Sequence, residues 1–179
     1  MPAPGGRPSR VERDHYSAPL VETKTTIGWR EWVRLPDLGE VLVKAKVDTG
    51  ARTSSLHAFD LSESERDGET WIDFSFHPLQ RDTETVVSGS ARLVDRRTVT
   101  ASNGQSELRP VVETDLELDE RRLPIELTLT RRDAMGFRML LGRRALREDF
   151  LIDPRRSYRG VESKALRKRE RQERRAAAK

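Results

Sequence analysis

A run of seven residues, VLVKAKV (41–47), constrains the fold more than any other part of the sequence. Its odd-numbered positions are all Val or Ala, and two of its even-numbered positions are Lys. A period of two is the pattern of a β-strand that buries one face and exposes the other. The turn-forming segment PDLGE (36–40) precedes the run, and the β-type segment TIGWREWVRL (26–35) precedes that turn. We therefore expect a hairpin whose second strand leads directly into Asp48.

Short segments of the same kind fill most of the chain that follows. ETWIDFSFHPL (69–79) alternates apolar and polar residues, runs rich in Val, Thr and Leu come after it, and FLIDP (150–154) forms a last strand. Only LLGRRALRED (140–149) has a helix-forming composition. The sequence therefore predicts one all-β domain over residues 26–154, built from short strands with one short helix near residues 142–149.

The two ends differ from this body in composition. Residues 1–22 contain Pro, Gly, Ser and charged residues without periodicity, which predicts a disordered leader. Residues 155–179 contain 11 Lys or Arg against 3 Glu, a net charge of +8, so the rest of the chain carries −4 of the total of +4. This basic segment has almost no apolar stripe, so we expect a helical or disordered tail. It is either a solubilising appendage or a contact for ribosome or RNA phosphates.

The chain has no cysteine, which excludes a disulfide framework, a thiolate metal site and a cysteine nucleophile. No apolar run approaches the roughly 18 residues that a membrane-spanning helix needs, and the first residues lack the apolar core of a signal peptide. These features predict a soluble, cytoplasmic protein with no membrane partner.

The segment Asp48-Thr49-Gly50 directly follows the alternating run and is the first candidate for chemistry. Glycine lets the backbone bend tightly and bring its N–H groups near the acid, and the Thr hydroxyl can hydrogen-bond to a matching loop. When two such loops meet, two carboxylates about 3 Å apart share one proton, so one acts as an acid and the other as a base that activates water. The chain has one D-[TS]-G segment. Either a second copy supplies the other aspartate in a C2 dimer, or Asp48 only begins a turn.

A resemblance favours the first alternative. KVDTGARTSSLHA (46–58) resembles the active-site segment of retropepsin-like aspartic peptidases, and MLLGRRAL (139–146) resembles their hydrophobic-Gly-Arg segment with its short helix. Together with RPVV (109–112) and ELTLTRRDAM (126–135), these blocks resemble a bacterial family of retropepsin-like endopeptidases long labelled putative ATP-dependent zinc proteases.

The resemblance covers about residues 26–154 and implies a retropepsin-like closed β-barrel. It also implies a homodimeric aspartic endopeptidase, a hydrolase of peptide or protein substrates, in which Asp48, Thr49 and Gly50 of each copy form the catalytic loop. The runner-up hypothesis is a non-catalytic binding module of the same fold that contacts ribosome or RNA through its tail.

The older family label is not supported by the residues. No phosphate-binding loop of the G-x-x-x-x-G-K-[ST] type is present, and His15, His57 and His77 lack the spacing of zinc ligands. We therefore expect no cofactor and no metal, and a metal-dependent hydrolase remains an alternative.

The sequence departs from the retropepsin pattern at Arg52, where many members have an acid that pairs with the Arg of the hydrophobic-Gly-Arg segment, here Arg143. Two guanidinium groups in this place need acidic partners. The candidates are Glu148, Asp149, Asp153 or a carboxylate of the substrate.

This departure suggests an acidic substrate. We expect Arg52, Arg109 and Arg131 to line the cleft together with Ala51 and His57, and to favour carboxylates through bidentate contacts. Some members of the family are associated with ligases that add glutamates to a ribosomal protein, which implies glutamate-rich substrates and hydrolysis of peptide or glutamyl amide bonds. The alternative is that these arginines pair with local acids on a β surface.

Two hairpin tips are candidates for the flap that covers a retropepsin active site. VVSGSAR (86–92) is preferred over TASNGQSE (100–107), because it follows the strand after the active-site segment. The two lysines of the 41–47 run should point away from the core. If either lysine reached Asp48, it would favour the ionised acid and weaken the shared-proton hypothesis.

Overall fold

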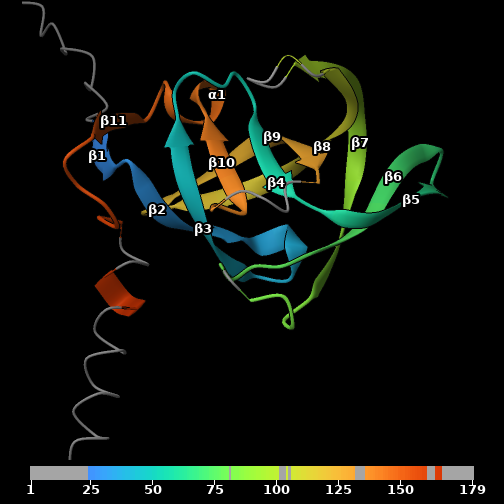
Figure 1. Cartoon of the computed structure of the whole chain (residues 1–179), viewed down its shortest axis with the longest axis horizontal. Coiled ribbons are helices and arrows are strands. Elements are labelled where there is room, and N and C mark those ends of the chain that lie inside the picture. Colours follow the sequence, from blue (N-terminus) through green and yellow to red (C-terminus); the bar gives the residue numbers. More distant parts are fainter. Residues whose placement is uncertain are drawn as a thin grey trace, which may run out of the picture.

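The computed structural model describes residues 24–80, 82–100, 104, 106–131, 136–160 and 164–166 (Figure 1). The predicted leader, residues 1–22, and most of the predicted tail, residues 167–179, lie outside the described residues. None of the described helices is long and apolar enough to cross a membrane.

The described chain is mainly β-structure, as predicted. Its elements are β1 (Thr25–Gly28), β2 (Arg30–Leu35), η1 (Pro36–Leu38), β3 (Val41–Asp48), β4 (Ser54–His57), β5 (Phe59–Arg66), β6 (Glu69–Phe76), β7 (Val87–Thr100), β8 (Ser106–Leu118), β9 (Arg121–Thr130), β10 (Met139–Gly142), α1 (Arg143–Leu146) and β11 (Phe150–Asp153). Strands β2, β3, β10, β4, β9 and β8 pair in that order, and β8 pairs again with β2 through Arg34 and Glu117. This ring is the predicted closed barrel, and β7, β6 and β5 continue the sheet outward from β8 (Figure 1).

The core follows from the alternation in the sequence. In β3 the predicted inward residues Val43, Ala45 and Val47 are buried, and Val41 at the start of the strand is half-buried. The same rule holds in β6, where the inward side chains are all buried. These are Ile72, Phe74 and Phe76. Because the period is two, the alternate residues of β3, which include Lys44, Lys46 and Asp48, point outward and share one face of the strand.

A fully buried carboxylate ties the chain after β11 to the barrel. Glu31 of β2 is 0% exposed, and its oxygens accept hydrogen bonds from the N–H groups of Gly28 (2.7 Å), Arg159 (2.8 Å) and Gly160 (3.2 Å). Charge-assisted bonds from backbone N–H groups compensate for taking the carboxylate out of water. The first residues of the predicted tail therefore pack against the body, and Tyr158 also donates its N–H to the carbonyl of Arg30 (2.8 Å).

Two details differ from the sequence predictions. Helix α1 ends at Leu146 rather than near residue 149, because the Asp149 carbonyl accepts a hydrogen bond from Thr25 (2.9 Å) and leads into the parallel pairing of β1 with β11. The preferred flap tip at residues 86–92 is wrong, because Val87–Thr100 is one continuous strand.

Gly89 explains this error. An added Cβ there would lie 3.1 Å from Phe74 Cζ and 3.2 Å from Leu38 Cδ2. This glycine therefore allows β7 to pack closely, and it does not form a turn. The hairpin of β7 and β8 is instead connected at residues 101–105, within the second candidate segment; of these five connecting residues, only Gly104 is among the described residues.

Candidate active site

Asp48 is the last residue of β3, and it pairs with Gly142 at the end of the parallel strand β10. The turn that follows folds back on the carboxylate: Asp48 Oδ1 accepts hydrogen bonds from the N–H groups of Gly50 (3.1 Å) and Ala51 (3.2 Å). Asp48 is half-buried, whereas Thr49 and Gly50 are exposed. One carboxylate oxygen is thus fixed by the loop, and among the described residues the other oxygen has no hydrogen-bond partner.

Close contact with the chain around Gly142 fixes this loop. An added Cβ on Gly142 would lie 2.5 Å from the carbonyl carbon of Thr53 and 2.6 Å from its oxygen. The Gly142 N–H also donates to Ser54 Oγ (3.2 Å), and the buried Ser54 carbonyl accepts from Thr128 Oγ1 (2.9 Å). The glycine of the hydrophobic-Gly-Arg segment is therefore required for the loop after Asp48 to lie against β10.

Arg143 clamps the same loop from α1. Its Nη1 donates to the carbonyls of Gly50 (2.9 Å) and Thr49 (3.4 Å), and its backbone N–H donates to the carbonyl of Ala51 (2.9 Å). The expectation that Arg143 needs Glu148, Asp149 or Asp153 is wrong, because carbonyl oxygens of the loop satisfy it. Those three acids pair instead with other arginines, namely Arg147, Arg121 and Arg156.

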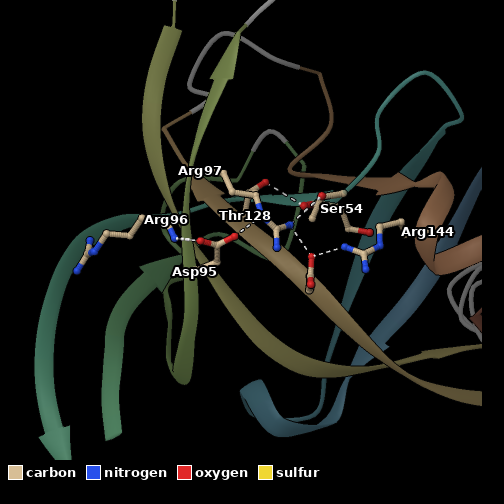
Figure 2. A network of polar contacts seen from close by, with 8 residues as sticks. Ser54, Asp95, Arg96, Arg97, Thr128 and Arg144 are labelled. Atoms are coloured by element: carbon tan, nitrogen blue, oxygen red, sulfur yellow. Dashed lines mark hydrogen bonds and ion pairs between the residues drawn. The ribbon is translucent and has the colours of Figure 1, made fainter.

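A network of charged residues lies beside the chain segment that follows this loop (Figure 2). Arg97 of β7 donates to Thr53 Oγ1 (3.4 Å), to Asp95 and to Glu126, and Glu126 also accepts from Arg144 Nη1 of α1 (2.8 Å). The hydrogen bond from Arg97 holds the pKa of Glu126 below its usual value, and the same bond raises the pKa of Arg97. Strands β7 and β9, helix α1 and the loop are thereby joined beside a pocket of about 290 Å³ lined by Thr53, Glu126 and Arg144.

The sequence did not predict this network. Arg97 and Glu126 are 29 residues apart, and Arg97 and Thr53 are 44 residues apart, so only the strand register brings them together. No local motif indicates such contacts.

The structure brings only some of the predicted substrate-binding residues to Asp48. Ala51 and Arg52 belong to the loop, and the exposed Arg52 guanidinium has no hydrogen-bond or ion-pair partner within the described residues. Arg52 is therefore free to meet a ligand. The Arg52 carbonyl, in contrast, is held by the N–H of Arg144 (3.1 Å).

The other three predicted residues lie away from Asp48. His57 is 1% exposed, and its backbone N–H donates to the Arg138 carbonyl (2.7 Å). Arg138 lies four residues before Gly142, the residue that pairs with Asp48, and four residues of extended chain span about 13 Å. Arg131 follows Thr130, the residue that pairs with His57. Arg109 donates to Glu107 (2.8 Å), which also accepts from Thr130 (3.3 Å), so Arg109 has the local acidic partner of the alternative hypothesis.

No three His, Cys, Asp or Glu side chains gather closely enough to hold a metal ion within the described part of the chain. His57 instead stacks on His77, with ring centroids 6.3 Å apart and an interplanar angle of 17°, and Phe59 lies beside both rings.

Comparison with known proteins supports the architecture. The model of a family described as "RimB-like: Retropepsin-like aspartic endopeptidase RimB" matches residues 26–163. A crystal structure of a Legionella pneumophila protein of unknown function is similar, with a TM-score of 0.66 and 26% identity, over 76% of this chain and 98% of that chain.

Curated relatives have a different name. A probable alpha-L-glutamate ligase from Desulfotalea psychrophila is 49% identical over 73% of this chain and 28% of its own length. Proteins of the same name from Shewanella pealeana and Parasynechococcus marenigrum are 44% and 47% identical, over 78% and 75% of this chain and 30% and 29% of theirs. The chain thus spans about three tenths of the length of these relatives.

Proposed function

Because the chain belongs to the RimB-like family of retropepsin-like aspartic endopeptidases, we propose that it is an aspartic peptidase whose catalytic dyad is formed by Asp48 from each of two copies. The observation that carries this proposal is the Asp48 loop: a carboxylate at a strand end, with one oxygen bound by two backbone N–H groups and the other without a partner among the described residues.

The chemistry follows from pairing two such loops. With one proton shared between two carboxylates, the ionised Asp48 removes a proton from a bound water, and the water oxygen attacks the amide carbon. The protonated Asp48 donates its proton to the carbonyl oxygen, giving a neutral tetrahedral diol, which then breaks the C–N bond as the amine leaves with a proton. Thr49 and Gly50 form the loop, and the Arg143 side chain keeps the carbonyls of these two residues turned toward α1.

The position of Asp48 is compatible with a symmetric dimer. Its loop is exposed, so a second copy can approach it. The two-stranded sheet of β1 and β11 lies beside this end, because the carbonyl of Trp29, just after β1, accepts the N–H of Val47 (2.9 Å). Edge strands pair readily with a second chain, and we propose that this sheet forms the dimer contact.

Exposed positive charge in the Asp48 loop favours an acidic substrate. Arg52 is exposed in the loop itself, and the relatives that contain a similar segment are named glutamate ligases. A chain of glutamates added by such a ligase is a substrate that the Arg52 guanidinium would bind. The scissile bond is then a peptide or glutamyl amide bond between glutamates.

The test combines oligomeric state with hydrolysis. Wild type, Asp48→Asn and the matched control Asp67→Asn, a change in the β5–β6 turn, are compared by analytical ultracentrifugation and with quenched glutamate-rich peptides. We expect a wild-type dimer that hydrolyses the peptides, an inactive Asp48→Asn dimer and a fully active control. A folded Asp48→Asn variant with wild-type activity would refute the dyad, and activity lost on chelation and restored by zinc would support a metal-dependent hydrolase instead.

A further inference from the structure

Lys46 lies two residues before Asp48 on the same, outward face of β3. The residue between them, Val47, is 9% exposed and points into the core, whereas Lys46 is exposed. Side chains two positions apart on one strand face are about 6.6 Å apart. The outward row Lys44, Lys46, Asp48 therefore ends at the candidate catalytic carboxylate.

Arg30 of β2 is the direct cross-strand partner of Lys46. Its guanidinium lies over two aromatic rings, 4.5 Å from the ring centroid of Trp29 and 4.9 Å from that of Tyr158. Its Nε is buried and has no hydrogen-bond partner in the described parts of the chain. Aromatic rings therefore hold this guanidinium in place, and no acid among the described residues neutralises it.

Lys44 is held in the same way. Its Nζ lies 4.7 Å from the ring centroid of Trp32 and 5.9 Å from that of Tyr158, and Trp32 is the cross-strand partner of Lys44. In the described part of the chain none of Arg30, Lys44 and Lys46 forms an ion pair, and neither lysine binds Asp48. Arginines elsewhere on the barrel, such as Arg92, Arg97 and Arg122, do pair with acids.

We propose that Lys46, Arg30 and Lys44 form a carboxylate-binding subsite that guides an extended acidic peptide along the outside of β2 and β3 to Asp48. This inference rests on the proposed function and names the residues that determine its substrate preference. An extended peptide repeats its side chains at the same spacing of about 6.6 Å, so glutamates two positions apart meet Lys44 and Lys46 while the next amide reaches Asp48. Aromatic rings hold the cations of Arg30 and Lys44 in place before the peptide binds.

The same contacts disfavour single-stranded RNA as the occupant. Bases bind such surfaces by stacking on open aromatic faces. Here Trp29, Trp32 and Tyr158 each have a cation over the ring, so the surface offers positive charge rather than stacking.

Binding in a hydrolysis-deficient background tests the subsite. In the Asp48→Asn chain, fluorescein-labelled hexaglutamate is titrated by fluorescence polarisation at low salt, with hexaglutamine and a uridine decamer as comparison probes. Lys46→Glu is compared with Lys164→Glu, which makes the same charge change at an exposed lysine outside the barrel. We expect hexaglutamate to bind about tenfold more weakly to the Lys46→Glu chain and equally to the Lys164→Glu chain, because attraction to a desolvated carboxylate becomes repulsion.

Lys46→Gln should give a smaller loss of about threefold, since it removes the charge without adding repulsion. Equal hexaglutamate binding by Lys46→Glu and Lys164→Glu overturns the subsite, as does a loss confined to the uridine decamer. These readouts do not require hydrolysis. If Lys46→Glu weakens hexaglutamate binding but the chain with Asp48 intact never hydrolyses glutamate-rich peptides, the subsite stands and the peptidase proposal is refuted.

Discussion

Gly142→Ala is the sharpest test of how the structure holds its candidate catalytic loop. Gly142 has an extended backbone (φ −76°, ψ 159°) that alanine adopts without strain, so the only new feature is the methyl group. That methyl would lie 2.5 Å from the Thr53 carbonyl carbon, 2.6 Å from its oxygen and 2.9 Å from the Arg52 oxygen. These are backbone atoms rather than flexible side-chain ends, so the loop and β10 must separate by about 1 Å to restore van der Waals contact.

Overpacking of this kind costs about 1–3 kcal/mol. Separation of the loop from β10 also lengthens the hydrogen bonds from Gly142 to Ser54 and from Arg143 to Ala51. We therefore expect the loss of unfolding free energy to lie in the upper part of that range. Urea unfolding followed by circular dichroism measures this loss: the midpoint should fall, and the dependence of the unfolding free energy on urea concentration should not change.

Gly136→Ala is the matched control, because an added Cβ there meets no atom of the described residues within 4 Å and its φ lies outside the left-handed region. We expect this control to be neutral or slightly stabilising. A Gly142→Ala midpoint equal to that of the control would refute the close approach of loop and strand. Because the shift displaces the loop that contains Asp48, peptide hydrolysis should also fall in Gly142→Ala and persist in Gly136→Ala.

Two further predictions concern buried and partly buried acids. Arg97 holds the pKa of Glu126 below its unfolded value of about 4.3, so the stabilisation that Glu126 provides is present above that pH and is lost as pH falls through the folded pKa. The difference in unfolding free energy between wild type and Glu126→Gln should therefore be largest near pH 7 and narrow below about pH 4; a difference that widens on acidification contradicts the assignment. Glu31→Gln places an amide NH₂ among the N–H donors of Gly28, Arg159 and Gly160, so we expect a loss of about 1–3 kcal/mol and faster tryptic cleavage after Arg159. Unchanged cleavage would show that Glu31 does not anchor this segment.

The features that the sequence predicts correctly depend on local patterns. The strand before Asp48 follows from alternation alone, and the return of the Gly50 N–H to the carboxylate follows from three consecutive residues. The closed barrel came from resemblance, because no local pattern specifies that β8 pairs with β2.

The features that could not be predicted from the sequence depend on the register between strands or on the structural role of a single glycine. Gly89 was interpreted as a turn residue, although it makes room for Phe74 and Leu38 within a long strand. Glu31 had a usable signal: it shares the inward face of β2 with Val33 and Leu35, and an acid on a buried face must have hydrogen-bond donors around it. The identity of those donors, residues 159 and 160, could not be read from that pattern.

The distribution of cations around Asp48 connects the fold to the proposed chemistry. The Arg143 side chain binds carbonyls of the turn after Asp48, so it orders this turn without pairing with the carboxylate. Lys46 lies two residues before Asp48 in the chain and Arg52 lies four residues after it, and neither has an acidic partner within the described residues. Positive charge is thus placed where a substrate would lie, while Asp48 itself is bound by neutral N–H groups. A carboxylate paired directly with Lys or Arg would stay ionised and could not share a proton with its counterpart. The same arrangement that attracts an acidic chain therefore leaves the Asp48 carboxylate without an ion pair among the described residues, as the proposed pairing of two such loops requires.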